Sequence, residues 1–441
     1  LTPEERLQAA LVPDWEWPYK LPENWCWTRH NSIMDIVGGA QPEKAFFIRE
    51  SKEGYVQLYQ TRDYGENPVP VYIPQKYATK TTDEGDILLA RYGGSLGKVF
   101  RAHKGAYNVA LAKVIILYPE VVDDEFLYLY YYSHFYQDFC IKAGYGRSAQ
   151  AGFNKSDLNE LLFPLPPFIE QQRIVDRIES LFAKLDEAKE KAQAVVDSFE
   201  TRKAAILHKA FTGELTAKWR KEHGVGMESW EVRTLDSVCS SIFDGDHMPP
   251  PKAESGIPFL VISNVNTGHL TFENTRFVPQ EYYDTLSDTR KPQLGDVLYT
   301  LVGSFGIPVV VNSKRPFCFQ RHMALLRPID VSPQFLWYIL QTPEMYDKAS
   351  SIATGTAQLT VPIKGLRAMT IPRPNIAEQV EIVRILDGFF AREQSAKEAA
   401  EAVLDQINLM KKSILARAFR GELGTNDPSE ESAVELLKQI I

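Results

Sequence analysis

A long internal repeat constrains this chain more than any other feature of its sequence. The segment from Phe163 to Leu215 returns as the segment from Ile371 to Leu423, and matched residues are 208 positions apart throughout. Glu170-Gln171 in the first copy, for example, corresponds to Glu378-Gln379 in the second. Since a repeat in fixed register sets the architecture of a chain, we expect a molecule built from two similar halves.

Both copies of the repeat carry the pattern of a long paired helix. In the first copy, apolar residues recur in alternating steps of four and three from Ile174 to Phe199, which is a heptad seam. No proline follows Pro167 in the first copy or Pro374 in the second, so each predicts one continuous helix of about 40 to 45 residues. Two such helices in one chain most simply pair with each other, and a plain coiled-coil spacer or dimerisation device is the alternative.

One position breaks the seam. Glu393 stands in the second copy where the first has Leu185. A buried carboxylate costs several kcal/mol unless it is paired. We therefore expect Glu393 at the edge of the helix pair or facing a partner.

A globular unit precedes each helix. In the first, short runs rich in Val, Ile, Leu and Tyr predict strands, and the aromatic stretch Phe126 to Phe139 predicts one helix. The second unit repeats landmarks of the first, such as Gly303-Ser304-Phe305-Gly306 for Gly94-Ser95-Leu96-Gly97, while the strand sequences diverge. The expected fold class is α+β, with two α/β units at opposite ends of an antiparallel two-helix coiled coil.

The expected domains follow the repeat. They are an N-terminal arm (1–20) with a short helix in TPEERLQAAL, a first globular unit (21–163), a first helical region (164–223), a second globular unit (224–371) and a second helical region with a tail (372–441).

Composition narrows the class of protein. A hydrophobic content of 44% and a charged content of 24% are ordinary for a soluble globular protein, and no apolar run is long enough for a membrane span. The four cysteines are scattered without a C-x-x-C pair, which predicts thiols in a reducing cytoplasm. The net charge of −8 argues against a general polyanion binder.

The catalytic and metal-binding motifs that we sought do not occur. Gly93 to Lys98 reads GGSLGK, which lacks the spacing of a phosphate-binding P-loop, and Val99 stands where the magnesium-binding hydroxyl would be. There is no H-E-x-x-H and no G-x-S-x-G with partners for it. The sequence therefore predicts a binding protein with no catalytic residue and no metal site.

Polar and glycine-rich loops at matching places in both units are the candidate ligand site. Small residues allow close backbone approach to a phosphate, and Arg, Lys, Asn and Gln side chains reach base edges. Any one of them could instead be a solvated loop residue, so the prediction depends on their clustering. The candidate DNA-binding residues are Arg91, Tyr92, Gly94, Ser95, Lys98, Arg147, Ser148, Gln150, Asn154 and Lys155 in the first unit, and Asn264, Asn266, Gly303, Ser304, Lys314, Arg321, His322, Thr356, Gln358 and Lys364 in the second.

Several of these motifs resemble one family. P-L-P-P-x-x-E-Q-x-x-I-V from Pro164, the two copies of A-F-x-G-E-L, the LPENW opening and G-D-I-L…G-S-x-G are similar to the specificity (S) subunit of type I restriction–modification systems. The resemblance spans essentially the whole chain.

The resemblance implies a function and a set of partners. The two globular units would be target recognition domains, each reading one half of a bipartite, asymmetric site in double-stranded DNA. The paired helices would set the spacing of the half-sites and dock two modification (M) subunits, and restriction (R) subunits would join the full complex. S-adenosylmethionine, ATP and Mg would bind to those partners and no cofactor to this chain. The setting would be the cytoplasm of a prokaryote.

Two alternative functions remain open beside this interpretation, and the sequence departs from the family pattern at one place. A coiled-coil scaffold that joins proteins without reading DNA is the first rival. A fused restriction–modification enzyme is the second, and the lack of methyltransferase and helicase motifs argues against it. The departure is that the second unit has I-P-F-L-x-I-S-N from Ile257, whereas the first has YVQLYQTRDYG at that place, which leaves its base-reading positions less defined.

Overall fold

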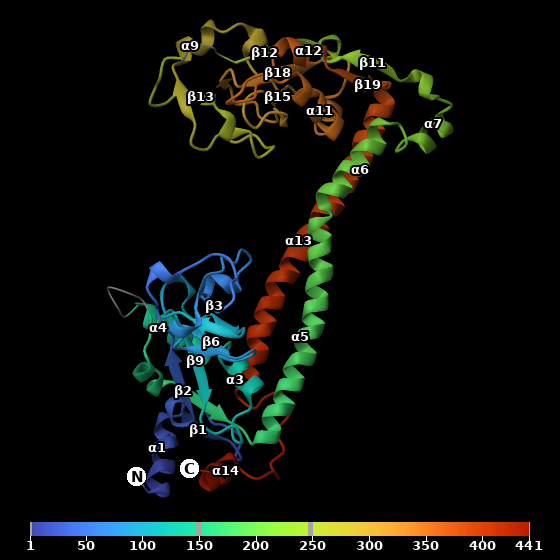
Figure 1. The fold of residues 1–441 in the computed structure, drawn as a ribbon. Coiled ribbons are helices and arrows are strands. Elements are labelled where there is room, and N and C mark those ends of the chain that lie inside the picture. The colour runs from blue at the N-terminus through green and yellow to red at the C-terminus, as the bar shows by residue number, and fades with distance from the viewer. Residues whose placement is uncertain (1, 146–151, 246–249, 441) are drawn as a thin grey trace. The chain divides into compact units, whose positions relative to one another are not determined.

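The computed structural model describes residues 2–145, 152–245 and 250–440. The chain forms two units. Unit 1 comprises Leu1–Ala192 and Ala402–Ile441, and unit 2 comprises Gln193–Glu401 (Figure 1). Each unit therefore combines one globular part with portions of both helical regions.

The globular part of unit 1 contains three small sheets. A four-stranded antiparallel sheet has the order β2-β9-β6-β7, a second sheet has the order β4-β3-β8-β5, and β1 pairs with β10. The strands are β1 (Cys26–Arg29), β2 (Met34–Gly38), β3 (Tyr55–Tyr59), β4 (Tyr72–Pro74), β5 (Thr81–Thr82), β6 (Ile87–Ala90), β7 (Val99–Arg101), β8 (Gly105–Tyr107), β9 (Leu111–Ile116) and β10 (Leu162–Leu165).

Unit 2 repeats this plan strand for strand, apart from β5. Its sheets have the orders β12-β18-β15-β16 and β14-β13-β17, and β11 pairs with β19. Its strands are β11 (Glu231–Thr234), β12 (Cys239–Asp244), β13 (Ile257–Leu260), β14 (Arg276–Val278), β15 (Val297–Thr300), β16 (Pro308–Val310), β17 (Cys318–Phe319), β18 (Met323–Pro328) and β19 (Thr370–Arg373). The strand sequences diverge while the topology is kept.

The stretch that departs from the second unit's motif is also part of this common plan. In unit 1 β3 is followed by a 3₁₀ turn at Thr61–Tyr64, as β13 in unit 2 is followed by one at Ile262–Asn264. The Asp63 carboxylate accepts from the Gln60 amide at 2.8 Å, and the Asn264 amide oxygen accepts from the Val261 amide at 3.0 Å. YVQLYQTRDYG thus forms the same local structure with a different sequence.

The N-terminal helix was predicted correctly, but the aromatic helix was not. Thr2 and Glu5 form a capping box at α1 (Pro3–Ala10). The stretch 126–139, predicted as one helix, is divided between α3 (Asp124–Tyr130) and α4 (His134–Tyr145). The remaining short helices are α2 (His30–Ile33), α7 (Ala217–His223), α8 (Leu235–Val238), α9 (Gln280–Thr285), α10 (Pro333–Leu340), α11 (Pro343–Ile352), α12 (Ile363–Ala368) and α14 (Ala433–Ile440).

The two long helices differ in continuity. The second repeat forms one helix, α13 (Ile376–Ala418), as predicted. The first is interrupted at Ser198 and consists of α5 (Phe168–Asp197) and α6 (Phe199–Phe211). The Ser198 hydroxyl donates to the Ala194 carbonyl at 2.5 Å, and the Arg202 guanidinium donates to the Val195 carbonyl at 3.1 Å. Side-chain donors that compete for helix carbonyls in this way weaken the backbone ladder.

Within each unit the helical segments lie antiparallel. In unit 1 the start of α5 meets the tail beyond α13, because Arg173 forms a two-pronged ion pair with Glu430 at 2.7 and 2.8 Å. Further along α5, Asp186 pairs with Lys411 of α13 at 2.6 Å. In unit 2 Glu393 of α13 pairs with Arg202 of α6 at 2.7 Å. Glu393 thus finds its counter-charge inside the chain, on the neighbouring helix.

The repeated glutamines tie each long helix to its globular part. Gln171 accepts from the Asp123 amide at 2.8 Å and donates to the Val121 and Pro166 carbonyls. Gln379 makes the corresponding bonds to the Ser332 amide and the Pro374 carbonyl at 2.9 Å each. Both glutamine side chains are fully buried.

The repeated glutamates are buried beside them, and each accepts from three donors that come from two other segments. Glu170 accepts from Trp25 and Asn426 at 2.8 Å and from Thr425 at 3.3 Å. Burial raises the pKa of Glu170 above its ordinary value, and the Asn426 and Trp25 bonds oppose this shift. All three donors are neutral.

Glu378 occupies the same position in unit 2 but meets a cation. It accepts from Thr216 at 2.7 Å, from Arg220 at 2.6 Å and from Trp230 at 2.9 Å. Arg220 is itself 7% exposed. We refer to these two arrangements as the glutamate clamps.

The different donors predict different costs of removing the charge. Glu378→Gln leaves Arg220 buried without its counter-ion and should lower the free energy of unfolding by about 3–5 kcal/mol. Glu170→Gln disturbs only neutral hydrogen bonds and should cost about 1–3 kcal/mol. Urea unfolding of the full chain checks the order, with the exposed Glu187→Gln on α5 as the matched control. Equal losses at the two clamps would contradict this account.

Candidate nucleic-acid interface

In unit 2 the two loops that the sequence singled out lie against each other. The loop after β15 and the loop after α11 meet through a bridge between Val302 and Thr360, and the Gly303 amide donates to the Leu359 carbonyl at 3.0 Å. Gly303 has a φ of +72°, and a Cβ there would lie 3.2 Å from the Gln358 amide nitrogen. The backbone conformation favours glycine at this position, and the lack of a side chain leaves room for the end of Gln358.

These loops form one wall of an open cleft of about 390 Å³. Arg321 and His322, which follow β17, form part of its lining with Gln358, Thr360 and Asp244. Burial lowers the pKa of His322, and the positive charge of Arg321 lowers it further, so the imidazole is neutral at pH 7. Three predicted residues from two separate segments are thus brought to one place.

The other unit 2 candidates are distributed around and away from this cleft. Thr356 and Ser304 are exposed on the two loops, and Lys364 is exposed near the start of α12. Asn266 and Lys314 are exposed too but do not line the cleft.

Asn264 is in the interior and does not fit its predicted role. It is 2% exposed, and its side chain bonds to the Val261 amide and the Glu273 carbonyl, at 3.0 Å in both cases. It holds the turn after β13, as Asp63 does in unit 1. A polar residue in a loop motif gives the same sequence signal for either role.

Unit 1 brings the equivalent loops together. Tyr92 forms a bridge to Gly152, the Phe153 amide donates to the Arg91 carbonyl at 3.2 Å, and the Tyr92 hydroxyl donates to Asn154 at 3.1 Å. The Arg91 guanidinium lies 4.8 Å from the centre of the Tyr92 ring and donates to the Val109 carbonyl at 2.8 Å. Arg91, Tyr92 and Asn154 therefore form one cluster.

The remaining unit 1 candidates have other placements. Gly94 and Ser95 lie in the 3₁₀ turn Gly93–Ser95 beside this cluster. The Lys155 ammonium pairs with Asp35 at 2.6 Å, so its charge is already matched. Lys98 lines a different hollow, between α3, α4 and the long helices. Arg147, Ser148 and Gln150 lie outside the described residues.

A second cleft in unit 1 contains residues that sequence reasoning missed. It measures about 820 Å³, and its polar lining includes Gln41, Lys44, Arg49, Gln60 and Arg62. Lys44, Arg49 and Arg62 are exposed. The sequence signal that could have revealed them is the number of basic and amide residues in the YVQLYQTRDYG stretch and in the loop after β2.

The first residue that lines this cleft, Gln41, follows Gly38 closely in the chain, and a Cβ at Gly38 would lie 2.9 Å from the Arg91 guanidinium. Unit 1 therefore presents cationic and amide side chains both at the Arg91 cluster and in this cleft, where Glu43 adds a carboxylate. The cationic and amide groups donate to phosphates and to base edges in the major groove.

Within the part of the chain that the structure describes, no cluster of three or more His, Cys, Asp or Glu residues could hold a metal ion. Over the same residues, no helix is long and apolar enough to cross a membrane.

Comparison with known families decides the identity of this arrangement. The family model described as the type I restriction modification DNA specificity domain matches twice, over residues 22–196 and 227–404. The chain belongs to this family. The two matches contain the two globular parts and the beginnings of the two long helices, so this specificity subunit carries two recognition domains.

Relatives and solved structures agree over nearly the full length. The specificity subunit of the type I restriction enzyme EcoKI from Escherichia coli K12 is 26% identical over 458 aligned residues, which cover 96% of each chain. A solved chain from a study of assembly and conformational transition of the type I R-M system has a TM-score of 0.70 at 22% identity and covers 92% of this chain and 100% of its own. The HsdS subunit from Thermoanaerobacter tengcongensis has a TM-score of 0.61 at 21% identity, covering 92% and 99%. These two structures support the fold.

Family membership confirms the main interpretation of the sequence. The chain is a DNA-recognition subunit of the type I class and is non-catalytic. The mixed helix and sheet fold with two recognition domains and long helices is confirmed as well.

The contrast between Asn264 and its neighbour gives a direct test of the site assignment. Asn264→Ala removes two buried hydrogen bonds and should lower the free energy of unfolding by about 1–3 kcal/mol. Asn266→Ala, at an exposed position on the same loop, is the control and should leave thermal stability unchanged. Equal melting temperatures for the two variants would show that the Asn264 side chain does not hold this turn.

Proposed function

We propose that this specificity subunit reads a bipartite, asymmetric target in double-stranded DNA, one half with each unit. The observation that carries the proposal is the unit 2 cleft, where Arg321 and His322 from one segment meet Gln358 from another. Arranged side by side, such groups can address successive base pairs.

The side-chain types in this cleft fit base edges in the major groove. Arginine pairs with the O6 and N7 acceptors of guanine, glutamine with N6 and N7 of adenine, and an aspartate such as Asp244 accepts from the cytosine amino group. The exposed glycine-bearing loop at Gly303 and Ser304 leaves room for the DNA backbone.

In unit 1 the proposed base-reading surface combines the Arg91–Tyr92–Asn154 cluster with the cleft at Arg49 and Arg62. Its sequence and shape differ from those of unit 2, although the strands beneath have the same order. Two unlike surfaces on one common frame favour two unlike half-sites. An asymmetric target follows from this difference.

The helical regions are the proposed platform for two modification subunits. Exposed apolar side chains support this proposal: Val380, Leu409 and Met410 on α13 are 58%, 65% and 50% exposed, and Ile169 on α5 is 57% exposed. A partner subunit that packs on these helices would remove this apolar surface from water, which favours association. Restriction subunits would join the same complex.

The domain divisions and the cellular setting belong to the same proposal. The arm is 1–20, the recognition domains are 21–163 and 224–371, and the helical regions are 164–223 and 372–441. S-adenosylmethionine, ATP and Mg would be bound by the partner subunits and no cofactor by this chain, in the cytoplasm of a prokaryote.

If each unit reads one half-site, substitutions in one unit should reduce the sequence preference for that half-site only. In the complex with modification subunits, Gln358→Ala with Arg321→Ala should weaken binding and relax one half of the target, while Arg49→Ala with Arg62→Ala should relax the other. Each lost base contact should cost about 1–3 kcal/mol of discrimination. Selection of bound duplexes from a random library, followed by sequencing, measures this directly.

Lys218→Ala, which alters an exposed position on α7 that lines neither cleft, serves as the control. A uniform loss of affinity for all duplexes, with the selected sequences unchanged, would contradict base reading by these residues. It would assign them to phosphate contacts, which salt dependence would then reveal.

A further inference from the structure

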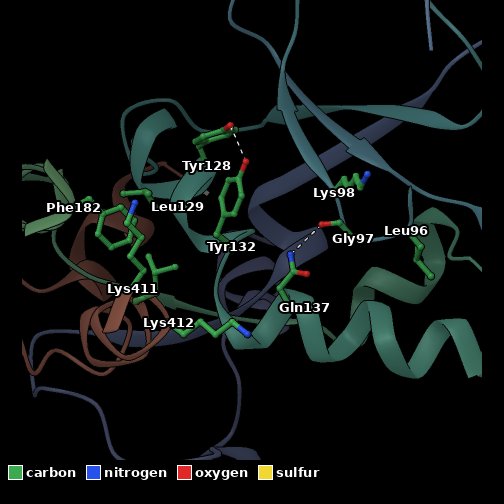
Figure 2. Close-up of a pocket in the computed structure, with 11 residues that line it drawn as sticks. Leu96, Gly97, Lys98, Tyr128, Leu129, Tyr132, Gln137, Phe182, Lys411 and Lys412 are labelled. Atoms are coloured by element: carbon green, nitrogen blue, oxygen red, sulfur yellow. Dashed lines mark hydrogen bonds between the residues drawn. The ribbon is translucent and has the colours of Figure 1, made fainter. Parts of the chain in front are cut away.

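Unit 1 contains a hollow that is lined by none of the residues of the proposed base-reading surface. It measures about 650 Å³ and lies between α3, α4, the loop before β7 and the helices α5 and α13 (Figure 2). We refer to it as the helix-side hollow. It is lined by Leu96, Gly97, Lys98, Tyr128, Leu129, Tyr132, Gln137, Phe182, Lys411, Lys412 and Leu415.

The polar groups in this wall are largely occupied by the chain itself. The Tyr132 hydroxyl donates to the Val99 carbonyl at 3.1 Å and lies 3.0 Å from the Tyr128 hydroxyl. The Gln137 amide donates to the Gly97 and Tyr131 carbonyls at 3.0 and 2.8 Å. What remains for a ligand is mainly apolar and aromatic surface, which suits an apolar side chain.

Three lysines surround this apolar surface (Figure 2). Lys411 is paired with Asp186 at 2.6 Å, and its ammonium lies 4.8 Å from the centre of the Phe182 ring. Among the described residues, Lys98 and Lys412 have no ion-pair partner and are exposed. The rim therefore carries unmatched positive charge and attracts an acidic partner.

The corresponding place in unit 2 indicates what fits such a hollow. Tyr338 of α10 occupies the position of Leu129 in α3, and Phe390 of α13 that of Phe182 in α5. The Tyr338 ring stacks on Phe390 with 5.5 Å between ring centres, and its hydroxyl donates to Asp387 at 2.5 Å. In unit 1 the smaller Leu129 leaves this space open. In unit 2 the equivalent space is thus filled by an aromatic side chain that is bonded to a carboxylate.

We propose that the helix-side hollow receives an aromatic side chain carried on an acidic segment of a partner polypeptide. The cavity takes the ring, and Lys98 and Lys412 meet the acidic flanks. Because Tyr338 occupies the matching place in unit 2, the segment binds once per chain, through unit 1. Lys98 is the one DNA candidate among the residues that line the hollow, and the variants that test the inference leave Lys98 unchanged.

A peptide probe tests the proposal on the full chain. The probe is a short fluorescein-labelled peptide with one tryptophan flanked by glutamates, and its fluorescence anisotropy reports binding. We expect saturable binding at one site. Leu129→Tyr, which fills the hollow as Tyr338 does, should weaken it about tenfold or more, and Lys412→Glu should weaken it similarly.

Matched controls separate this effect from misfolding and from charge alone. Leu117→Tyr and Lys218→Glu change an exposed leucine and an exposed lysine elsewhere and should leave probe binding unchanged. Peptides with alanine for tryptophan, or with lysine for glutamate, should not bind. Thermal melting of every variant identifies any loss of fold, and Lys412→Glu alters only an exposed position.

Three results would overturn the proposal. They are no saturable binding of the acidic tryptophan peptide, unchanged binding to Leu129→Tyr, and displacement of the probe by a single-stranded oligonucleotide. The last would assign the hollow to nucleic acid. Because half-site selection does not use the probe, failure here leaves the proposed DNA reading untouched, and the reverse also holds.

Discussion

A buried carboxylate at the start of each long helix joins the parts of each unit. A charge removed from water must be met by donors or it destabilises the fold strongly. Glu170 and Glu378 therefore fix three things at once: the first strand region through a tryptophan, the helix that carries them, and the segment that follows the end of the other repeat. The register between the antiparallel helices depends on this contact as much as on the heptad seam.

The two clamps also show how a duplicated frame diverges. Thr216 and Arg220 meet Glu378, whereas Thr425 and Asn426 meet Glu170, so one carboxylate faces a cation and the other only neutral donors. The two units also differ in side chain at the equivalent positions Leu129 and Tyr338, and in the sequence of the turn that follows β3 and β13. Strand order is constrained by pairing in the sheets, but the side chains that face outward or fill local gaps are not.

Sequence reasoning predicted what local periodicity encodes. The heptad steps gave α13 and the Thr2 cap gave α1, but nothing local distinguished Ser198 as an interruption, because a serine is tolerated in a helix until its hydroxyl finds a carbonyl. The pairing of β1 with β10 has no local signal, because the two strands are more than a hundred residues apart in the sequence. At the site, matching loops were found by comparing the two units. Arg49 and Arg62 lie where that comparison has no counterpart, and Asn264 has the residue type of a reader but the position of a turn support.

The division of the chain into units has a consequence for its synthesis. Unit 2 is one uninterrupted stretch, Gln193–Glu401, whereas unit 1 needs both the first part of the chain and Ala402–Ile441. The hydrogen bonds to Glu170 from Thr425 and Asn426, and the one from Tyr19 to Phe419, can form only after all of unit 2 has been translated. The recognition domain that is translated first is thus completed after the second one. Until then, the apolar face of α5 is not covered by α13, and Glu170 lacks the donors from Thr425 and Asn426.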